Sequence, residues 1–176
     1  VNQETVAREL AMALTSDDQE VRLAAADSLA RIGERTGRLD DDVAEMTVAA
    51  MAAGDRDMKL LLIRALAACQ GDEIAALLNV HLRDGDAFLR QEAIRALAKQ
   101  GQVGAEIGNL FNDPDPAVRQ SAAEAIAGTG REDAVKPLVE FAMAFEGYHG
   151  NRTARLLRDL DSPQASALFI DVLRDP

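Results

Sequence analysis

A short phrase recurs five times along the chain, and this repeat constrains the fold more than any other feature of the sequence. Successive copies are spaced by about 31 residues, except that the first step is longer by about six residues, which we place near 37–42. The copies begin at Val21, Met58, Leu89, Val118 and, in a degraded form, at His149. Such a period indicates an array of small units that are stable only when each one stacks on its neighbours.

Each copy has the pattern of an amphipathic helix. In the third copy, Leu89, Ala93 and Leu97 lie on one helical face. An acidic residue stands three positions before each start, where its carboxylate can accept hydrogen bonds from the first backbone N–H groups. These first helices are predicted near 19–32, 56–69, 87–99, 116–128 and 149–160. The glycines predicted to end them in the left-handed conformation are Gly33, Gly101 and Gly130.

A second helix is predicted after each first helix, for example over 72–82, 133–141 and 162–173, and the chain opens on one further helix. Aromatic residues make up only 3% of the chain and alanine is abundant, which favours closely packed helices over a sheet. The sequence therefore predicts an all-α solenoid of about five helix pairs plus one leading helix. We expect a single array over 1–176 that is a piece of a longer protein.

The repeat resembles the HEAT family, in the short form often called the PBS-lyase HEAT-like repeat. The resemblance rests on the Asp-Pro-Asp-Pro-Ala-Val-Arg stretch at 113–119, the alanine-rich segment after it, Gly130, and a short second helix with Ala134 and Leu138. It implies a right-handed α–α superhelix that acts as a scaffold and binds a partner protein or peptide on its concave face. The alternative that it implies is phycobilin-lyase-like handling of a chromophore or cofactor on a client protein.

Acidic and basic residues form a regular ladder at the starts of the first helices. Its members are Asp18, Arg22, Asp55, Lys59, Asp86, Arg90, Asp115 and Arg119. The resemblance implies a structural role, in which each aspartate caps a helix and each basic side chain reaches acidic groups of adjoining turns. A binding stripe is the alternative interpretation.

Charge and composition narrow the classes of partner. The net charge of −11 disfavours binding to nucleic acid and to anionic membrane surfaces, and no apolar run reaches the length of a membrane span. One cysteine, Cys69, fits a reducing, cytoplasmic setting, and we expect it to be a small core residue. The partner we expect is another protein, and the chain itself is expected to be a monomer or to associate weakly end to end.

No catalytic motif or metal-ligand spacing is recognisable, so we expect neither an enzyme nor a cofactor. Neither His81 nor His149 is followed by glutamate, which the iron hydroxylases among HEAT-like proteins would require. The run Asp40, Asp41 and Asp42 is interpreted as a helix start, with Asp40 as the cap, rather than as a cation site.

The degraded fifth copy is the strongest candidate for a specific function. Three arginines lie there on one predicted helix face, next to aromatic residues and two glycines. The candidate binding residues are Phe145, Tyr148, His149, Asn151, Arg152, Arg155 and Arg158. The alternative is a degenerate repeat with a solvated arginine face.

Two glycines in the predicted second helix 102–111, Gly104 and Gly108, permit two interpretations. They allow close packing of adjacent repeats, or they form the floor of a groove that a ligand approaches.

Overall fold

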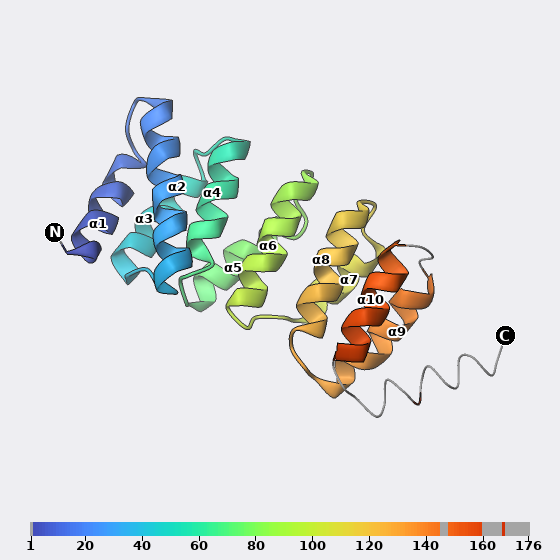
Figure 1. The fold of residues 1–176 in the computed structure, drawn as a ribbon. Coiled ribbons are helices and arrows are strands. Elements are labelled where there is room, and N and C mark those ends of the chain that lie inside the picture. The colour runs from blue at the N-terminus through green and yellow to red at the C-terminus, as the bar shows by residue number, and fades with distance from the viewer. Residues whose placement is uncertain (1, 145–147, 160–166, 168–176) are drawn as a thin grey trace. The chain divides into compact units, whose positions relative to one another are not determined.

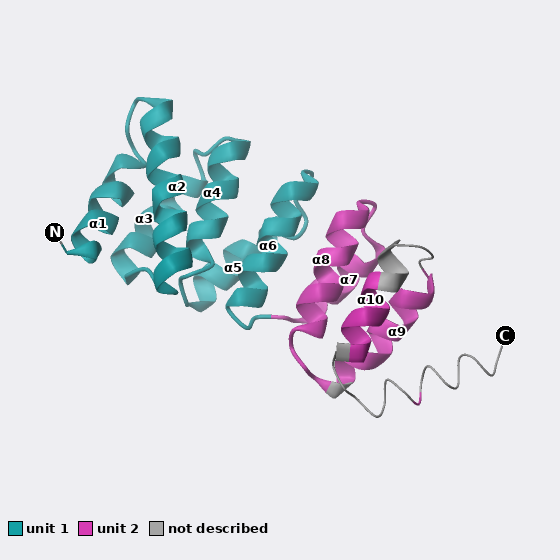
Figure 2. Ribbon diagram, in the orientation of Figure 1, with its two compact units in different colours: residues 1–102 teal, residues 103–176 magenta. Residues whose placement is uncertain are grey.

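The structure is a computed structural model that describes residues 2–144, 148–159 and 167. These residues form ten α-helices and two short 3₁₀-helices, with no strand among them (Figure 1). The all-α prediction is confirmed. The chain divides into two compact units, residues 1–102 and 103–176 (Figure 2). The boundary falls inside the third predicted helix pair, in a connection that contains Gly101 and Gly104.

Unit 1 contains a leading helix, two complete helix pairs and one further first helix. In chain order these are α1 (Gln3–Ala13), α2 (Gln19–Thr36), α3 (Asp41–Met51), α4 (Arg56–Leu66), α5 (Asp72–His81) and α6 (Ala87–Lys99). The first helices α2, α4 and α6 lie side by side (Figure 1). Leu29, Leu62 and Ile94 are fully buried in them.

Adjacent repeats of unit 1 are also joined through polar backbone groups. The side-chain amide of Gln100, just after α6, donates to the carbonyl oxygens of Leu66 and Cys69, both at 2.9 Å. Leu66 is the last residue of α4, and Cys69 lies three residues beyond it. The side chain of Gln100 therefore joins the end of α6 to the end of the preceding first helix.

The longer first step of the repeat lengthens a helix. α2 has 18 residues, whereas α4 has 11 and α6 has 13. Gly33 does not end α2, which corrects the prediction; the helix continues to Thr36, and Gly37 caps it with φ 74°. Gly33 is needed for packing instead, because a Cβ at this position would lie 2.8 Å from Cβ of Ala68. Gly101 and Gly130 do adopt the predicted left-handed conformation, with φ of 73° and 63°.

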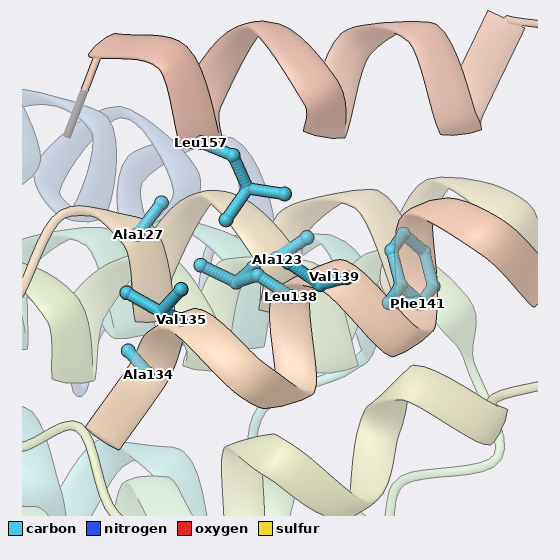
Figure 3. Packing of buried hydrophobic residues seen from close by; sticks show 8 residues of the cluster. All are labelled: Ala123, Ala127, Ala134, Val135, Leu138, Val139, Phe141 and Leu157. Atoms are coloured by element: carbon cyan, nitrogen blue, oxygen red, sulfur yellow. The ribbon is translucent and has the colours of Figure 1, made fainter. Parts of the chain in front are cut away.

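Unit 2 contains four α-helices in its described part. They are α7 (Ala105–Asn109), α8 (Pro116–Ala127), α9 (Val135–Ala144) and α10 (Tyr148–Asp159), with 3₁₀-helices at Leu110–Asn112 and Glu132–Ala134. Figure 3 shows the core, in which Leu157 of α10 lies against Leu138 and Val139 of α9 and against alanines of α8. The rings of Phe111 and Phe141 extend this core, with centroids 4.9 Å apart. Apart from residue 167, the second helix predicted over 162–173 lies outside the described residues.

Helix α7 is much shorter than predicted. The sequence predicts a helix over 102–111, whereas the α-helix starts only at Ala105, after Gly104, and tightens into a 3₁₀ turn at Leu110. Gly104 has extended backbone angles and no side chain that could cap the helix, and Gly108 lowers helix propensity inside it. Because α7 is short, it leaves part of the surface beside it uncovered.

Candidate functional site

The aspartates of the ladder are helix caps. Asp18, Asp86 and Asp115 each accept from two backbone N–H groups of the following turn, and Asp55 accepts from the N–H of Met58 at 2.9 Å. These contacts satisfy donors that a helix start would otherwise leave without partners.

The arginines of the ladder donate to backbone carbonyls of the loop that precedes their own helix. Nη1 of Arg22 donates to the carbonyls of Ser16 and Asp17, at 2.6 and 2.9 Å. Arg90 and Arg119 make the same pair of contacts in their own repeats, Arg90 to Asp84 and Gly85, and Arg119 to Asp113 and Pro114. Each arginine thus holds the loop that precedes its own helix. No such bond is made by Lys59 within the described residues.

Two further contacts between successive repeats come from the first residue of a first helix. Gln19 donates to the carboxylate of Asp55 at 2.9 Å, and Arg56 donates to that of Asp86 at 2.6 Å. The Arg56 hydrogen bond is the main reason why the pKa of Asp86 lies below its ordinary value. The next first helices begin with Ala87 and Pro116, which carry no side-chain donor.

The predicted binding site in the fifth copy is only partly described. Phe145 lies outside the described residues; Tyr148, His149 and Asn151 fall within α10, but their side chains are not described. Arg152, Arg155 and Arg158 are exposed on α10. Arg152 forms an ion pair with Glu124 of α8, at 2.5 Å between Nη2 and Oε1.

The aspartates at the start of α3, Cys69 and His81 could in principle take part in chemistry, but their surroundings suit a structural role. Asp40 precedes α3 but makes no side-chain cap bond, and Asp42 is paired with Arg8 of α1, whose hydrogen bond lowers the pKa of that carboxyl. Cys69 is buried, and burial raises its pKa to about 11. His81 is also buried, with Nδ1 3.4 Å from a carboxylate oxygen of Asp84.

A groove between the second helices α3 and α5 is the most distinctive surface of unit 1. Its volume is about 590 Å³. The residues that line it are Asp41, Ala44, Glu45, Val48, Ala49, Gln70, Gly71, Asp72, Glu73 and Ile74. Its floor is aliphatic, and four carboxylates stand around it. The sequence alone does not reveal this groove, because the groove depends on the separation of two helices that are about one repeat apart in the chain.

The four carboxylates of the groove differ from most carboxylates of the first helices. Asp41, Glu45, Asp72 and Glu73 are exposed, and within the described residues none has a cationic side chain in an ion pair. Carboxylates on the first helices are more often paired. Glu92 of α6, for example, accepts from Arg64 at 3.2 Å and from Arg95 at 2.6 Å. The described residues contain no group of three or more His, Cys, Asp or Glu side chains that could hold a metal ion.

A second groove, of about 480 Å³, lies in unit 2 along α7 and the start of α9. Gly104, Gly108, Phe111 and Ile126 line its apolar part, and the paired side chains of Arg131 and Asp133 stand at its edge. A Cβ added at Gly108 would have no neighbour nearer than 4.0 Å. Within unit 2, Gly108 is therefore not in close contact with a neighbouring helix.

None of the helices in the described part of the chain has both the length and the apolar character needed to span a bilayer.

Among known proteins, the family model for HEAT repeats matches residues 105–176. No curated protein matches the sequence. Solved structures with the same fold include an engineered protein with a TM-score of 0.64 and 23% identity, which spans 97% of this chain and 85% of its own.

The karyopherin Kap121p is also similar, in two complexes. In one complex, Kap121p is bound to the extreme C-terminus of the protein phosphatase Cdc14p (TM-score 0.68, 17% identity, covering 97% of this chain and 21% of the karyopherin). The other is bound to Ste12p (TM-score 0.62, 17% identity, 90% of this chain and 18% of the karyopherin). The HEAT-repeat prediction is confirmed for residues 105–176, which match the family, and nearly the whole chain has the all-α solenoid fold of engineered repeat proteins and a karyopherin.

Proposed function

We propose that this protein is an interaction scaffold that holds a peptide segment of a partner protein on the face formed by its second helices. The observation that carries the proposal is the groove between α3 and α5, about 590 Å³ in volume, with aliphatic residues on its floor and polar groups around it. A groove of this composition can take apolar side chains of a peptide while polar contacts fix its orientation.

Two further observations support binding rather than catalysis. The groove lining offers carboxylates, an amide and aliphatic side chains, but no nucleophile with an adjacent base among its described residues. The similar karyopherin structures are complexes with other proteins, one of them with the extreme C-terminus of Cdc14p. No observation on the described residues favours the chromophore-handling alternative.

Selection of peptides from a random displayed library, with the whole chain as bait, tests this function. The informative variant is Ala49→Arg, which places a long charged side chain in the groove from an exposed position of α3. The matched control is Ala24→Arg, at an exposed position of α2 outside the groove. Both replacements are good helix formers, so folding is preserved in each.

We expect enriched peptides to lose binding to the Ala49→Arg variant and to keep it with the Ala24→Arg variant. Enriched peptides that bind both variants equally would contradict the placement in the groove. A library from which no peptide is enriched would contradict the scaffold function itself.

We also propose α10 as a second contact region, for an acidic segment of a partner. Its support is the row of exposed arginines, Arg152, Arg155 and Arg158, in a chain with a net charge of −11. Arg152→Glu is a poor test, because it would place a second glutamate beside Glu124 and disturb the packing of α10 on α8. Arg155→Glu is cleaner, because the described residues hold no ion-pair partner for Arg155.

Binding of a glutamate-rich peptide, measured by fluorescence anisotropy, is expected to fall by about fivefold in Arg155→Glu, since one exposed ion pair becomes a repulsion. Arg83→Glu makes the same change of charge at an exposed position of unit 1 and should leave this affinity unchanged. Equal losses in the two variants would remove the proposed α10 region.

A further inference from the structure

We propose that the segment bound between α3 and α5 is cationic: a stretch of a partner protein in which lysine or arginine residues alternate with aliphatic ones. This inference rests on the proposed function and specifies the partner for one groove. Four carboxylates stand around the groove, and neither lysine nor arginine lines it. The occupant is therefore expected to bring the missing positive charge.

Stabilisation of helix N-termini offsets only part of the negative charge of these carboxylates. Asp41 stands in the first turn of α3, and Asp72 and Glu73 stand in that of α5, where the positive end of the helix dipole stabilises anions. Each helix N-terminus is equivalent to about half a positive charge, so the two helices offset about one of the four negative charges. The groove keeps a net charge of about −3 by this count.

Glu45 has no role in capping a helix. It lies one turn after Asp41 on α3, at the i,i+4 spacing at which like charges repel and destabilise a helix by about 0.2–0.5 kcal/mol. No ion pair among the described residues offsets this repulsion, and Glu45 lies beyond the first turn, where the helix dipole stabilises anions. A bound cationic side chain would remove this repulsion, and its removal would add to the free energy of binding.

The arrangement suits an extended polycation better than a single metal ion. The carboxylates are distributed over two helices, and no three acidic, histidine or cysteine side chains of the described chain converge on one point. Divalent cations need several oxygen ligands at one point. Basic side chains spaced along a peptide, in contrast, can each meet a different carboxylate.

The apolar floor sets the second requirement on the occupant. Ala44 and Ile74 are buried, while Val48 is half-buried and Ala49 is exposed. This surface can contact aliphatic side chains, or the methylene stems of lysine and arginine, between the charged contacts. A segment with only polar and charged residues would not contact this apolar surface. We therefore expect basic and aliphatic residues to alternate along the bound segment.

The test is the affinity of the whole chain for a short fluorescein-labelled peptide of lysine, leucine and serine, measured by anisotropy. The groove variant is Glu45→Gln with Glu73→Gln. The control is Glu20→Gln with Glu34→Gln, two exposed positions of α2 outside the groove. Each pair removes two negative charges, and each includes one first-turn glutamate, so net charge and helix effects are matched.

We expect the groove variant to bind the lysine peptide about tenfold more weakly, and the control variant to change by less than about twofold. Binding should weaken as salt is raised, and a peptide with glutamate in place of each lysine should not bind. Equal losses in the two variants would overturn the inference, because they would show attraction to the overall negative charge.

Different experimental results would contradict the cationic partner and the scaffold function. Displayed peptides that lose binding to Ala49→Arg but carry neutral or acidic sequences would overturn the cationic partner and leave the scaffold intact. Displacement of the lysine peptide by calcium at low concentration would also overturn it, in favour of a cation site. Enrichment of no peptide at all would overturn both.

Discussion

Gly33 and Gly108 are both helical glycines, yet their surroundings predict opposite effects of the same substitution. At Gly33 a Cβ would lie 2.8 Å from Cβ of Ala68 and 3.4 Å from the carbonyl oxygen of Ala65. Gly33→Ala should therefore push α2 away from the end of α4 and lower the free energy of unfolding by about 1–3 kcal/mol. Chemical denaturation of the purified variant measures this change.

Gly108→Ala is the matched control, since the nearest atom to its Cβ would be 4.0 Å away. It should raise the free energy of unfolding by about 0.5–1 kcal/mol through helix propensity. A stabilised Gly33→Ala variant would contradict the close contact between α2 and α4.

Cys69 should be unreactive in the folded protein. Burial raises the pKa of its thiol from 9.0 to about 11, so the reactive thiolate is scarce at pH 8. We expect alkylation by iodoacetamide to be slow in the folded chain and fast in denaturant. The raised pKa also favours the folded state below pH 9, and this contribution is lost as the pH rises from 9 to about 11. Fast alkylation of the folded chain at pH 8 would contradict the buried position.

The loops before the first helices should depend on the ladder arginines, and the chain offers an internal control. Arg90 is buried and donates to the carbonyls of Asp84 and Gly85, whereas Lys59, at the matching position, makes no such bond in the described residues. Arg90→Met should lower the free energy of unfolding by about 1–3 kcal/mol, because it leaves loop carbonyls without donors. Lys59→Met should change it by less than about 0.5 kcal/mol. Equal effects in denaturation would show that the arginine contacts do not hold the loop.

Sequence alone could predict the first helices because their starts are local. Asp115 and Pro116, for instance, specify a cap and a first turn without reference to any other part of the chain. The end of α2 could not be predicted in this way. Gly33 looks like a helix stop, but its role depends on Ala68, about one repeat further along the chain.

The candidate site depends still more on distant contacts. The sequence shows the acidic first turns of α3 and α5, and their usual explanation is helix stabilisation. These two first turns flank one groove because of the spacing between α3 and α5, which the sequence does not show. The basic cluster of the fifth copy was visible because it lies within one helix, but the pairing of Arg152 with Glu124 joins α10 to α8 and could not be inferred.

The division into two compact units predicts a local response to core damage. Leu138 is fully buried in the core of unit 2 (Figure 3). Leu138→Ala should lower stability by about 2–5 kcal/mol. Hydrogen exchange followed by mass spectrometry should show faster exchange in α8, α9 and α10, with α2 and α4 unchanged. Uniform loss of protection along the chain would instead indicate that the two units unfold together.

The proposed cationic segment binds between α3 and α5. Titration of the isotope-labelled chain with the lysine peptide, followed in amide correlation spectra, locates the bound segment residue by residue. Shift changes should concentrate in α3, α5 and the Gln70–Gly71 connection, and they should vanish in the Glu45→Gln, Glu73→Gln variant. Changes centred on unit 2, or spread evenly over the surface, would contradict the claim.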